Sequence, residues 1–508
     1  MISLQRKMPI FYSALLLTGV NLLLRMISTS FQVYLSGRIG AAGIGLLQLV
    51  MSVGALSMTA GMAGIRTTTM YLTAEELGKK RPGNVRWVLS GCVTYSILCS
   101  GLLSLFLHFA APTIATRWIG DSRTAEAIRL YGAFLPVSCL CGVMTGYFTA
   151  ANRIGTLAAV EVAEQLLSMG ATMVLLTLWA GAEPSRACRA VILGSGAGGC
   201  LTLLALVFLR LREGSPKSSP IPTARRLLHT AVPLALADDL KGGISTAENL
   251  MVPKRLALFP GSADPLAAFG MVCGMVFPVL MFPAAILFGL AELLIPELAR
   301  CAAAGSAARI RYLAARSLRI ALLYGFLFCG LEYLLAEALC TALYKTPEAG
   351  LWLRRFSLLI PMLYCDAITD AMTKGLGQQK ACVRYNILTS TLDVLFLFFL
   401  LPRFGMAGYY ISFLITHLLN FILSLRRLLR ITGPVLPWGQ ALGILLAAAC
   451  ALAAASLPAA ILPRILVYLP VFISLLCLFG ITGKEDLRWL RGLARGNAAL
   501  AANPGIIS

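Results

Sequence analysis

Long apolar runs recur along the whole chain, and they constrain its fold more than any other feature. A helix that crosses the ~30 Å hydrocarbon core of a membrane needs at least about 17 mostly apolar residues. Composition agrees with many such helices, because 58% of the 508 residues are hydrophobic and only 13% are charged. We predict an all-α membrane protein with about 14 transmembrane helices, near residues 9–34, 44–72, 87–111, 128–150, 155–180, 187–211, 228–252, 267–296, 315–340, 353–374, 384–402, 406–428, 438–460 and 464–482.

The net charge is +21, and the basic residues are distributed as the topology predicted from these runs requires. If the N-terminus lies inside, the inner segments hold roughly twice as many Lys and Arg residues as the outer segments, which satisfies the positive-inside rule. The richest loops, Arg210–Arg226 and Arg300–Arg319, are both predicted to lie inside. Contact with anionic headgroups explains this excess. We therefore expect the lipid bilayer as a partner and no nucleic acid.

The chain contains a weak internal repeat. An offset of 225 residues superimposes the first six predicted spans on the next six and aligns Gly45 with Gly270. Six spans in each half keep both halves in the same orientation, which gives parallel repeats around a central cavity. We predict an N-lobe over residues 1–215, a C-lobe over 216–433, and a segment over 434–508 that holds two further spans and a cytoplasmic basic tail.

Two arginines lie inside predicted spans. Arg25 is in the first span and Arg66 in the second, and neither span contains an Asp or Glu that would neutralise them. A charged side chain near the bilayer centre costs about 2.5–3.5 kcal/mol on insertion scales, so it usually faces a wet cavity and meets a partner there. Guanidinium groups also suit phosphate oxygens geometrically. We predict that both arginines bind an anion from outside the protein, and that the chain is a transporter. At ~1.5 Å per residue the two arginines lie at different depths, so either the first helix is broken and brings them together, or they hold the anion in succession.

Acidic residues in later spans indicate further sites. Asp239, Thr389 and Asp393 are candidates for an oxygen site that couples transport to Na⁺ or H⁺. Glu164 either balances the arginines when the cavity is empty and contacts the substrate, or simply stabilises the start of a helix. Asp366 is predicted to belong to the wall of the C-lobe cavity, where it would contact the substrate.

No pattern in the chain predicts catalysis. There is no Walker motif for ATP hydrolysis, and no soluble domain surrounds the carboxylates of the spans. The 14 cysteines are scattered without a CxxC pair, so neither a disulfide framework nor a zinc site is indicated. We therefore predict that the protein is not an enzyme and needs no cofactor or metal beyond Na⁺ or H⁺ for coupling.

Four segments in and next to the first seven predicted spans are informative when they are taken together. They are RMISTSFQVYLSGRIGAAGIGLLQL (Arg25–Leu49), AGMAGIRTTTMYLTAEE (Ala60–Glu76), GYFTAANRIGTLAAVEVAEQLL (Gly146–Leu167) and VPKRL (Val252–Leu256). These segments resemble the stage V sporulation protein B group of polysaccharide exporters. This group belongs to the superfamily that joins lipid II flippases, O-antigen flippases and multidrug and toxin extrusion transporters.

The resemblance implies export of a lipid-linked saccharide or peptidoglycan precursor across the bacterial cytoplasmic membrane, by alternating access between the lobes. Spore-wall synthesis is a candidate setting, and both termini are expected to be cytoplasmic. Arg25 and Arg66 match cavity positions that serve the diphosphate in related lipid II flippases. Gln32 stands where relatives often carry a second basic residue, and we assign it to substrate binding too. The resemblance also implies a gating role for Glu248 and supports a cation site in the C-lobe.

Two other functions remain open. A drug-cation antiporter of the multidrug and toxin extrusion type shares the architecture, but it would favour carboxylates in its early spans, where this chain has arginines. A non-transporting scaffold that recruits cell-wall synthesis enzymes predicts no loss when Arg25 becomes Ala. We expect a monomer whose partners are a lipid-linked anionic saccharide, the bilayer and, as candidates, cell-wall synthesis enzymes.

Overall fold

Helices make up all the regular secondary structure of the residues that the structure describes. The structure is a computed structural model and describes residues 10–79, 81–179, 184–212, 224–261, 263–435, 438–458 and 460–481. The helices are α1 (Ile10–Met62), α2 (Ile65–Gly78), α3 (Val85–Thr113), α4 (Ala125–Ala150), α5 (Ile154–Leu178), α6 (Pro184–Arg212), α7 (Ala224–Leu256), α8 (Pro265–Met271), α9 (Phe277–Leu280), α10 (Ala284–Ala303), α11 (Ala307–Tyr344), α12 (Pro347–Ser357), α13 (Ile360–Gly375), α14 (Gln379–Phe404), α15 (Met406–Thr432), α16 (Trp438–Ala455) and α17 (Ile461–Leu478), with short 3-10 or π turns η1 (Pro82–Asn84), η2 (Ile114–Ile119), η3 (Ser122–Thr124) and η4 (Val272–Val276).

Many of these helices are long and apolar enough to cross a membrane. Nine candidate spans of this kind occur among the described residues, and the bent pair Pro265–Leu280 and Ala284–Ala303 provides a tenth. Each of the predicted spans overlaps at least one described helix. The predicted class, an all-α protein that crosses the membrane many times, is confirmed.

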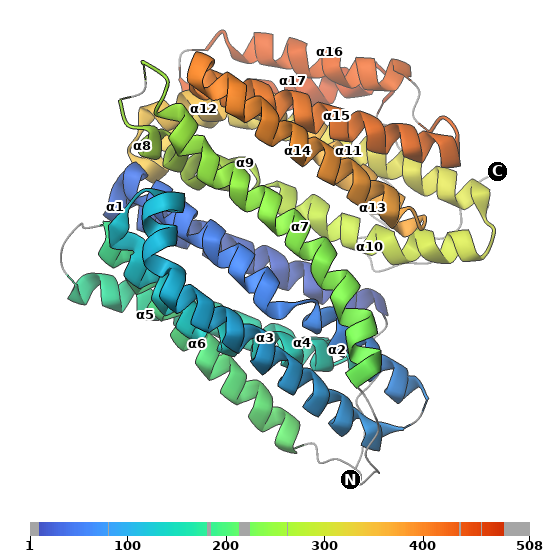
Figure 1. Cartoon of the computed structure of the whole chain (residues 1–508). Helices are drawn as coiled ribbons and strands as arrows, with labels where there is room; N and C mark the ends of the chain where they lie inside the picture. The colour runs from blue at the N-terminus through green and yellow to red at the C-terminus, as the bar shows by residue number, and fades with distance from the viewer. Residues whose placement is uncertain are drawn as a thin grey trace. The chain divides into compact units, whose positions relative to one another are not determined.

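The first candidate span, Leu22–Gly78, is too long for one crossing. Its 57 residues would extend about 85 Å at ~1.5 Å per residue, far more than a ~30 Å hydrocarbon core. The helix α1 is interrupted at Gly40, where φ is 69° and ψ is 178°, so it consists of two helical arms (Figure 1). Glycine enters this left-handed region without the steric penalty that a side chain would bring. The segment therefore holds two predicted spans.

The chain divides into two compact units, and each is described by itself. The first unit is Met1–Gly289, Ala342–Ala349 and Val383–Leu419, and the second is Leu290–Thr341, Gly350–Cys382 and Asn420–Ser508. The division into lobes over 1–215 and 216–433 stays a prediction. Its expected linker, within 213–223, and the expected basic tail from 482 onward lie outside the described residues.

In the first unit, α3 packs on α4, α4 on α6, and α5 on α6 (Figure 1). Small residues allow the last of these contacts, because a Cβ atom added to Gly194 or Gly198 of α6 would collide with Thr172 or Ser168 of α5. Small residues at such positions let membrane helices approach closely. In the second unit, Tyr468 of α17 is fully buried against α11, and its hydroxyl donates to the carbonyl oxygen of Phe326 at 2.8 Å.

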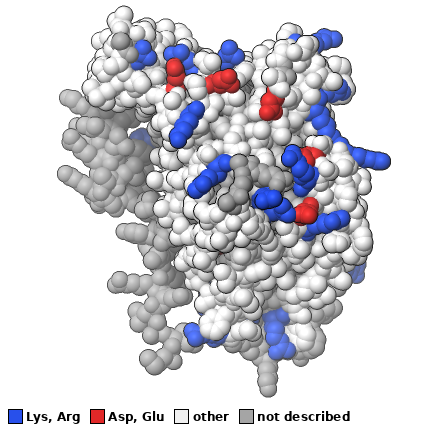
Figure 2. Space-filling model, turned by 90° about the vertical axis from the view of Figure 1, so that its left-hand side faces the viewer, with Lys and Arg blue, Asp and Glu red and all other residues white. Residues whose placement is uncertain are grey.

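The outer surface of the helices suits a lipid environment. Large apolar side chains such as Leu102, Phe109 and Leu178 are more than two-thirds exposed. Soluble monomers rarely expose contiguous apolar surface on this scale. Figure 2 shows a face of mostly uncharged residues on which Lys and Arg outnumber Asp and Glu.

Candidate functional site

The second predicted span is broken near its middle. The helix α1 ends at Met62 and α2 begins at Ile65, and between them Ala63 and Gly64 have positive φ angles of 43° and 71°. A non-glycine residue in this conformation costs of order 1 kcal/mol or more, so its surroundings must hold it. The hydroxyl of Tyr95 contributes, because it donates to the carbonyl oxygen of Ala63 at 3.3 Å. The break frees backbone groups that a continuous helix would satisfy internally.

Arg66 lies in the first turn of α2, directly after this break. The first N–H groups of a helix have no partner within the helix, and the helix dipole favours negative charge at that end. The guanidinium of Arg66 adds a full positive charge to a backbone terminus that already attracts anions. Broken membrane helices of this polarity are typical of transporter sites for anionic groups.

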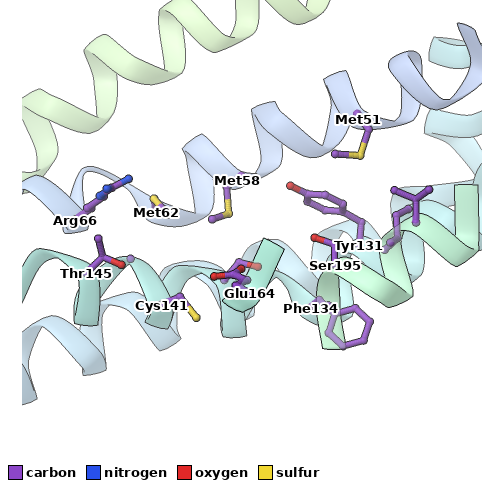
Figure 3. A pocket seen from close by; sticks show the side chains of 15 residues that line it. Met51, Met58, Met62, Arg66, Tyr131, Phe134, Cys141, Thr145, Glu164 and Ser195 are labelled. Carbon is purple, nitrogen blue, oxygen red and sulfur yellow. The ribbon is translucent and has the colours of Figure 1, made fainter. Parts of the chain in front are cut away.

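A cavity of about 360 Å³ lies between α1, α2, α4, α5 and α6 in the first unit. Arg66 and Thr145 are at one end of it, Met51 and Tyr131 are at the other, and Glu164 lies between them (Figure 3). The rest of the wall is mixed, with the hydroxyls of two serines on one side and further methionine thioethers on the other. These residues are Ser138, Ser195, Met58 and Met62.

The charge of Arg66 is available to a ligand. Glu161 of α5 is close enough to interact electrostatically with Arg66. In the part of the chain that the structure describes, however, no salt bridge within 4.0 Å joins Arg66 to a carboxylate. Glu164 interacts with the side chain of Thr202 on α6. The cavity therefore presents one permanent cation and one carboxyl group on different helices.

Arg25 and Gln32 lie elsewhere, against the segment formed by α8, η4 and α9. The guanidinium of Arg25 donates to the carbonyl oxygen of Met281 at 3.3 Å, in the turn that follows α9. The amide of Gln32 donates to the carbonyl oxygen of Gly274 at 3.1 Å, in the π-helical turn η4. Both acceptors belong to an irregular stretch of a bent span, whose carbonyl groups a regular helix would satisfy internally. One bond of Arg25 to a carbonyl leaves other guanidinium donors for a ligand.

The structure therefore does not bring the two predicted arginines into one cavity. Arg66 lines the cavity, whereas Arg25 is absent from its wall and contacts the α8–α9 segment instead. Of the residues predicted to bind substrate, Arg66 and Glu164 line this chamber.

Two carboxyl groups from distant parts of the first unit meet inside the protein. The side chains of Glu248 of α7 and Asp393 of α14 interact with each other, and two carboxyl groups this close favour a shared proton or a shared cation. Asp393 is only 6% exposed, and its Oδ1 accepts hydrogen bonds from Ser412 at 2.6 Å and from Thr416 at 3.1 Å. Ser412 and Thr416 are one helical turn apart on α15. Three helices thus converge on one oxygen-rich point.

This grouping differs from the predicted one. Asp239 precedes Glu248 by nine residues, about 13 Å along α7, and its neighbours are Asp238 and Tyr95 rather than Asp393. One of its carboxylate oxygens is buried without a hydrogen-bond partner among the described residues. Thr389 lies one turn before Asp393, but its hydroxyl donates to the carbonyl oxygen of Tyr385 at 3.0 Å. Glu248, predicted to act as a gate, takes the place expected for Asp239.

Asp366 lies in the second unit, and its charge has a local partner. The side-chain amide of Asn420 donates to both of its carboxylate oxygens, at 3.2 and 3.0 Å. One turn along α13, Asp370 forms a salt bridge of 2.6 Å with Lys374. A role of Asp366 in substrate binding stays a prediction.

Several residues of these sites were not predicted from the sequence. Ser412 and Thr416 carry a detectable signal, because two hydroxyls spaced one helical turn apart in an apolar helix share a face. Tyr131 and Ser195 carry no such signal, since single polar residues in apolar helices are common. Only the packing of α4 and α6 turns them toward one cavity.

Comparisons with known proteins agree with the predicted resemblance. Residues 18–174 match the family model MatE. Stage V sporulation protein B of Bacillus subtilis (strain 168) is 21% identical over 416 residues, which cover 79% of this chain and 80% of the relative. The lipid II flippase MurJ in an inward closed conformation has a similar structure, with a TM-score of 0.70 and 13% identity over 93% of this chain and 99% of that one. A multidrug resistance MATE family transporter in an inward-facing conformation gives a TM-score of 0.66 and 14% identity, over 82% and 98% of the two chains.

Proposed function

We propose that this chain, a membrane protein with the fold of MATE transporters and the lipid II flippase MurJ, is a flippase for a lipid-linked saccharide. Its substrate would be a polyprenyl diphosphate that carries a sugar or a peptidoglycan precursor. It would move this headgroup across the bacterial cytoplasmic membrane by alternating access. The similarity to stage V sporulation protein B supports spore-wall synthesis as the setting.

The observation that carries the proposal is the position of Arg66. It lies on the wall of a cavity, at the N-terminal end of a half-helix, with no salt bridge to a carboxylate among the described residues. A diphosphate offers the planar pairs of oxygens that a guanidinium fork binds well. The negative charge of the diphosphate would offset the cost of keeping the positive charge of Arg66 in the membrane.

Arg25 would act at a different stage of transport. Because its guanidinium contacts the bent α8–α9 segment, it lies outside the chamber of Arg66. We propose that the two arginines hold the headgroup in succession, with Gln32 beside Arg25 on the same helical arm. A change in the bend of the α8–α9 segment would release Arg25 from the carbonyl of Met281 and free it for phosphate.

The shared carboxyl pair is our candidate for energy coupling. Glu248 and Asp393 can hold a proton or a Na⁺ ion together with the hydroxyl oxygens of Ser412 and Thr416. Carboxylate and hydroxyl oxygens are the ligands that hard cations prefer. Loading this point would change the attraction between α7 and α14, and thereby favour one conformation of the transporter.

A drug-cation antiporter is the second candidate, and one observation favours it. The cavity of Arg66 also contains Glu164 and the aromatic rings of Tyr131 and Phe134. A carboxylate beside aromatic rings is suited to an organic cation. The permanent charge of Arg66 in the same chamber opposes such a ligand, so we prefer the anionic substrate.

Transport in reconstituted vesicles decides between these functions. A fluorescent undecaprenyl diphosphate disaccharide is supplied on one side, and its arrival on the other is followed with a membrane-impermeant quencher. Loss of a charged hydrogen bond is worth about 1.5–3 kcal/mol, so we expect Arg66→Ala to slow flipping roughly 10- to 100-fold. Arg66→Lys should retain part of the rate, since it keeps the charge but not the fork.

The control is Arg86→Ala. Arg86 stacks on the neighbouring ring of Trp87 at 5.0 Å and is absent from the cavity wall, so this variant should flip at the parent rate. The proposal is wrong if Arg66→Ala and Arg25→Ala both match the parent. Uptake of an organic cation such as ethidium, lost in Glu164→Gln but not in Arg66→Ala, would instead support the antiporter.

A further inference from the structure

A second charged pocket lies in the first unit, at the C-terminal end of α7. Its volume is about 330 Å³, room for roughly ten water molecules at ~30 Å³ each. Two consecutive basic residues, Lys254 and Arg255, line it together with Trp118 and Phe398. The side that α7 forms is apolar and consists of Ala247, Leu250 and Met251. The pocket thus has a cationic end and an apolar side.

The two cations are held in place by neutral groups. The ammonium of Lys254 donates to the backbone carbonyl oxygen of Arg117, in the π-helical turn η2 that follows α3. The guanidinium of Arg255 lies over the ring of Phe398, 3.2 Å from its centroid. Each group keeps several N–H donors beyond these contacts. No salt bridge within 4.0 Å joins either one to a carboxylate in the ranges that the structure covers, so an anion would be the missing partner.

The shape and position of the pocket favour an amphipathic anion over a free one. It lies where α7 and η2 end, as expected near the boundary between hydrocarbon and water. Trp118 and Phe398 are 43% and 42% exposed, and Leu258, which follows the end of α7, is 58% exposed. Aromatic rings and basic side chains are typical of membrane proteins at the headgroup level. Acyl chains could follow the apolar residues of α7 while a phosphate meets the cations.

We propose that this pocket binds the phosphate group of an anionic glycerophospholipid from the surrounding membrane. Lys254 and Arg255 bind the phosphate, Trp118 packs against the glycerol region, and Leu250 and Met251 contact the first part of the acyl chains. Bound there, the lipid joins α7 to η2. This places a structural lipid next to the helix that carries Glu248, and the site is independent of the proposed transport substrate.

The test is native mass spectrometry of the full-length protein in detergent, titrated with phosphatidylglycerol and, separately, with phosphatidylcholine. A basic residue near an anionic lipid surface is worth about fivefold in affinity. We therefore expect Lys254→Gln and Arg255→Gln each to weaken phosphatidylglycerol binding about fivefold, and the double variant to weaken it roughly 25-fold. Binding of phosphatidylcholine, whose headgroup has no net charge, should change little.

Arg354→Gln is the matched control. Arg354 is exposed and stacks on an aromatic ring, that of Tyr333, at 4.7 Å, but it belongs to the second unit and lines no part of this pocket. Its replacement should leave phosphatidylglycerol binding unchanged. If the double variant does not fold, the single variant Lys254→Gln provides the test. The side chain of Lys254 is exposed, so its replacement should not disturb folding.

Three results would overturn the proposal. The first is a double variant that binds phosphatidylglycerol as tightly as the parent. The second is a loss that affects undecaprenyl diphosphate but not phosphatidylglycerol, which would make the pocket part of the transport path. The third is inorganic phosphate that competes with phosphatidylglycerol at equal concentration, since a site for a free anion needs no acyl chains.

Discussion

The backbones of Gly45 and Gly270 are in direct contact. A Cβ atom added to Gly270 would lie 2.4 Å from the backbone nitrogen of Gly45 and 2.1 Å from the carbonyl oxygen of Ala41. These are the two glycines that the 225-residue offset aligns. Equivalent residues meet each other close to a two-fold axis, so this contact supports the proposed repeat. It also places the second arm of α1 directly against α8.

We expect Gly270→Ala to destabilise the protein by about 1–3 kcal/mol or more. The new methyl group would meet backbone atoms, which cannot move aside as a flexible side chain can. Thermal unfolding in detergent measures the effect. Gly101→Ala is the control, because a Cβ atom there meets nothing within 4 Å, and alanine in a helix gains up to about 1 kcal/mol over glycine. Equal melting temperatures for Gly270→Ala and the parent would contradict the close contact.

Arg226 links the start of α7 to the end of α2. Its guanidinium forms salt bridges of 2.9 Å with Glu76 and 2.7 Å with Glu75. The carboxylate of Glu76 is nearly fully buried and also accepts a hydrogen bond from Asn84 at 2.9 Å. Arg226→Gln leaves this buried charge with one neutral partner. We expect a loss of about 1–2 kcal/mol, less than for a fully buried pair because Arg226 is 39% exposed.

A double-mutant cycle with Glu76→Gln isolates this interaction. The two single variants should each lower the melting temperature, and the double variant should lower it by less than their sum. Lys79→Gln is the control, because the salt bridge of Lys79 with Glu75 is half-exposed and worth at most about 1 kcal/mol. Strict additivity would mean that Arg226 and Glu76 do not stabilise each other.

The connection between α3 and α4 should depend on pH through Asp121. Its carboxylate accepts hydrogen bonds from the backbone N–H of Arg123 at 2.9 Å and from its guanidinium at 2.8 Å. These bonds lower the pKa of Asp121 below its ordinary value of about 3.8. A lowered pKa means that the stabilisation is complete above the ordinary value and is lost as the pH falls through the lowered one.

Asp121→Asn should therefore cost about 1 kcal/mol at pH 7, the usual value of a capping side chain. The difference from the parent should shrink in acid, as the parent carboxylate becomes protonated. Thermal unfolding at pH 7 and at about pH 3 checks this. In an Arg123→Gln background the guanidinium bond is absent and the backbone bond remains, so the pH dependence should move part of the way toward that of an ordinary aspartate. An unchanged difference at both pH values would refute the assignment.

The sequence predicted best those features that depend on local composition. The span positions follow from the length of the apolar runs, and Arg66 was identified because a charge interrupts one of them. The break at Ala63–Gly64 was not predicted, since the surrounding residues read as continuous helix. Only the backbone geometry shows that Arg66 begins a new helix rather than continuing α1.

Contacts between distant helices were the part that could not be predicted. The seventh span offers both Asp239 and Glu248, and helical periodicity does not say which of them reaches Asp393, 145 residues beyond Glu248. That choice depends on the depth at which α7 crosses α14. For the same reason the sequence leaves open whether Arg25 meets Arg66 or acts in succession with it, and packing directs Arg25 toward Met281.

The pairing of Glu248 with Asp393 leads to the last prediction. Asp393→Asn and Glu248→Gln should each abolish the dependence of transport on Na⁺ or on pH, because each removes one oxygen site of the pair. Ser412→Ala should weaken the response roughly 10-fold or more, since it removes a 2.6 Å hydrogen bond to the carboxylate. Flipping rates measured with and without a Na⁺ or pH gradient provide the test.

Two controls make this prediction specific. Thr391 lies on α14, as Asp393 does, and its hydroxyl donates to a backbone group of α14, the carbonyl oxygen of Ile387, at 2.7 Å. Thr391→Ala should therefore keep the parent response. Asp239→Asn removes a carboxylate of the same helix as Glu248, and it should also keep the response, because Asp239 lies about 13 Å from the pair along α7. A response that is lost in Asp239→Asn but kept in Glu248→Gln would show that Asp239 carries the coupling ion, and that the carboxyl pair only holds α7 against α14.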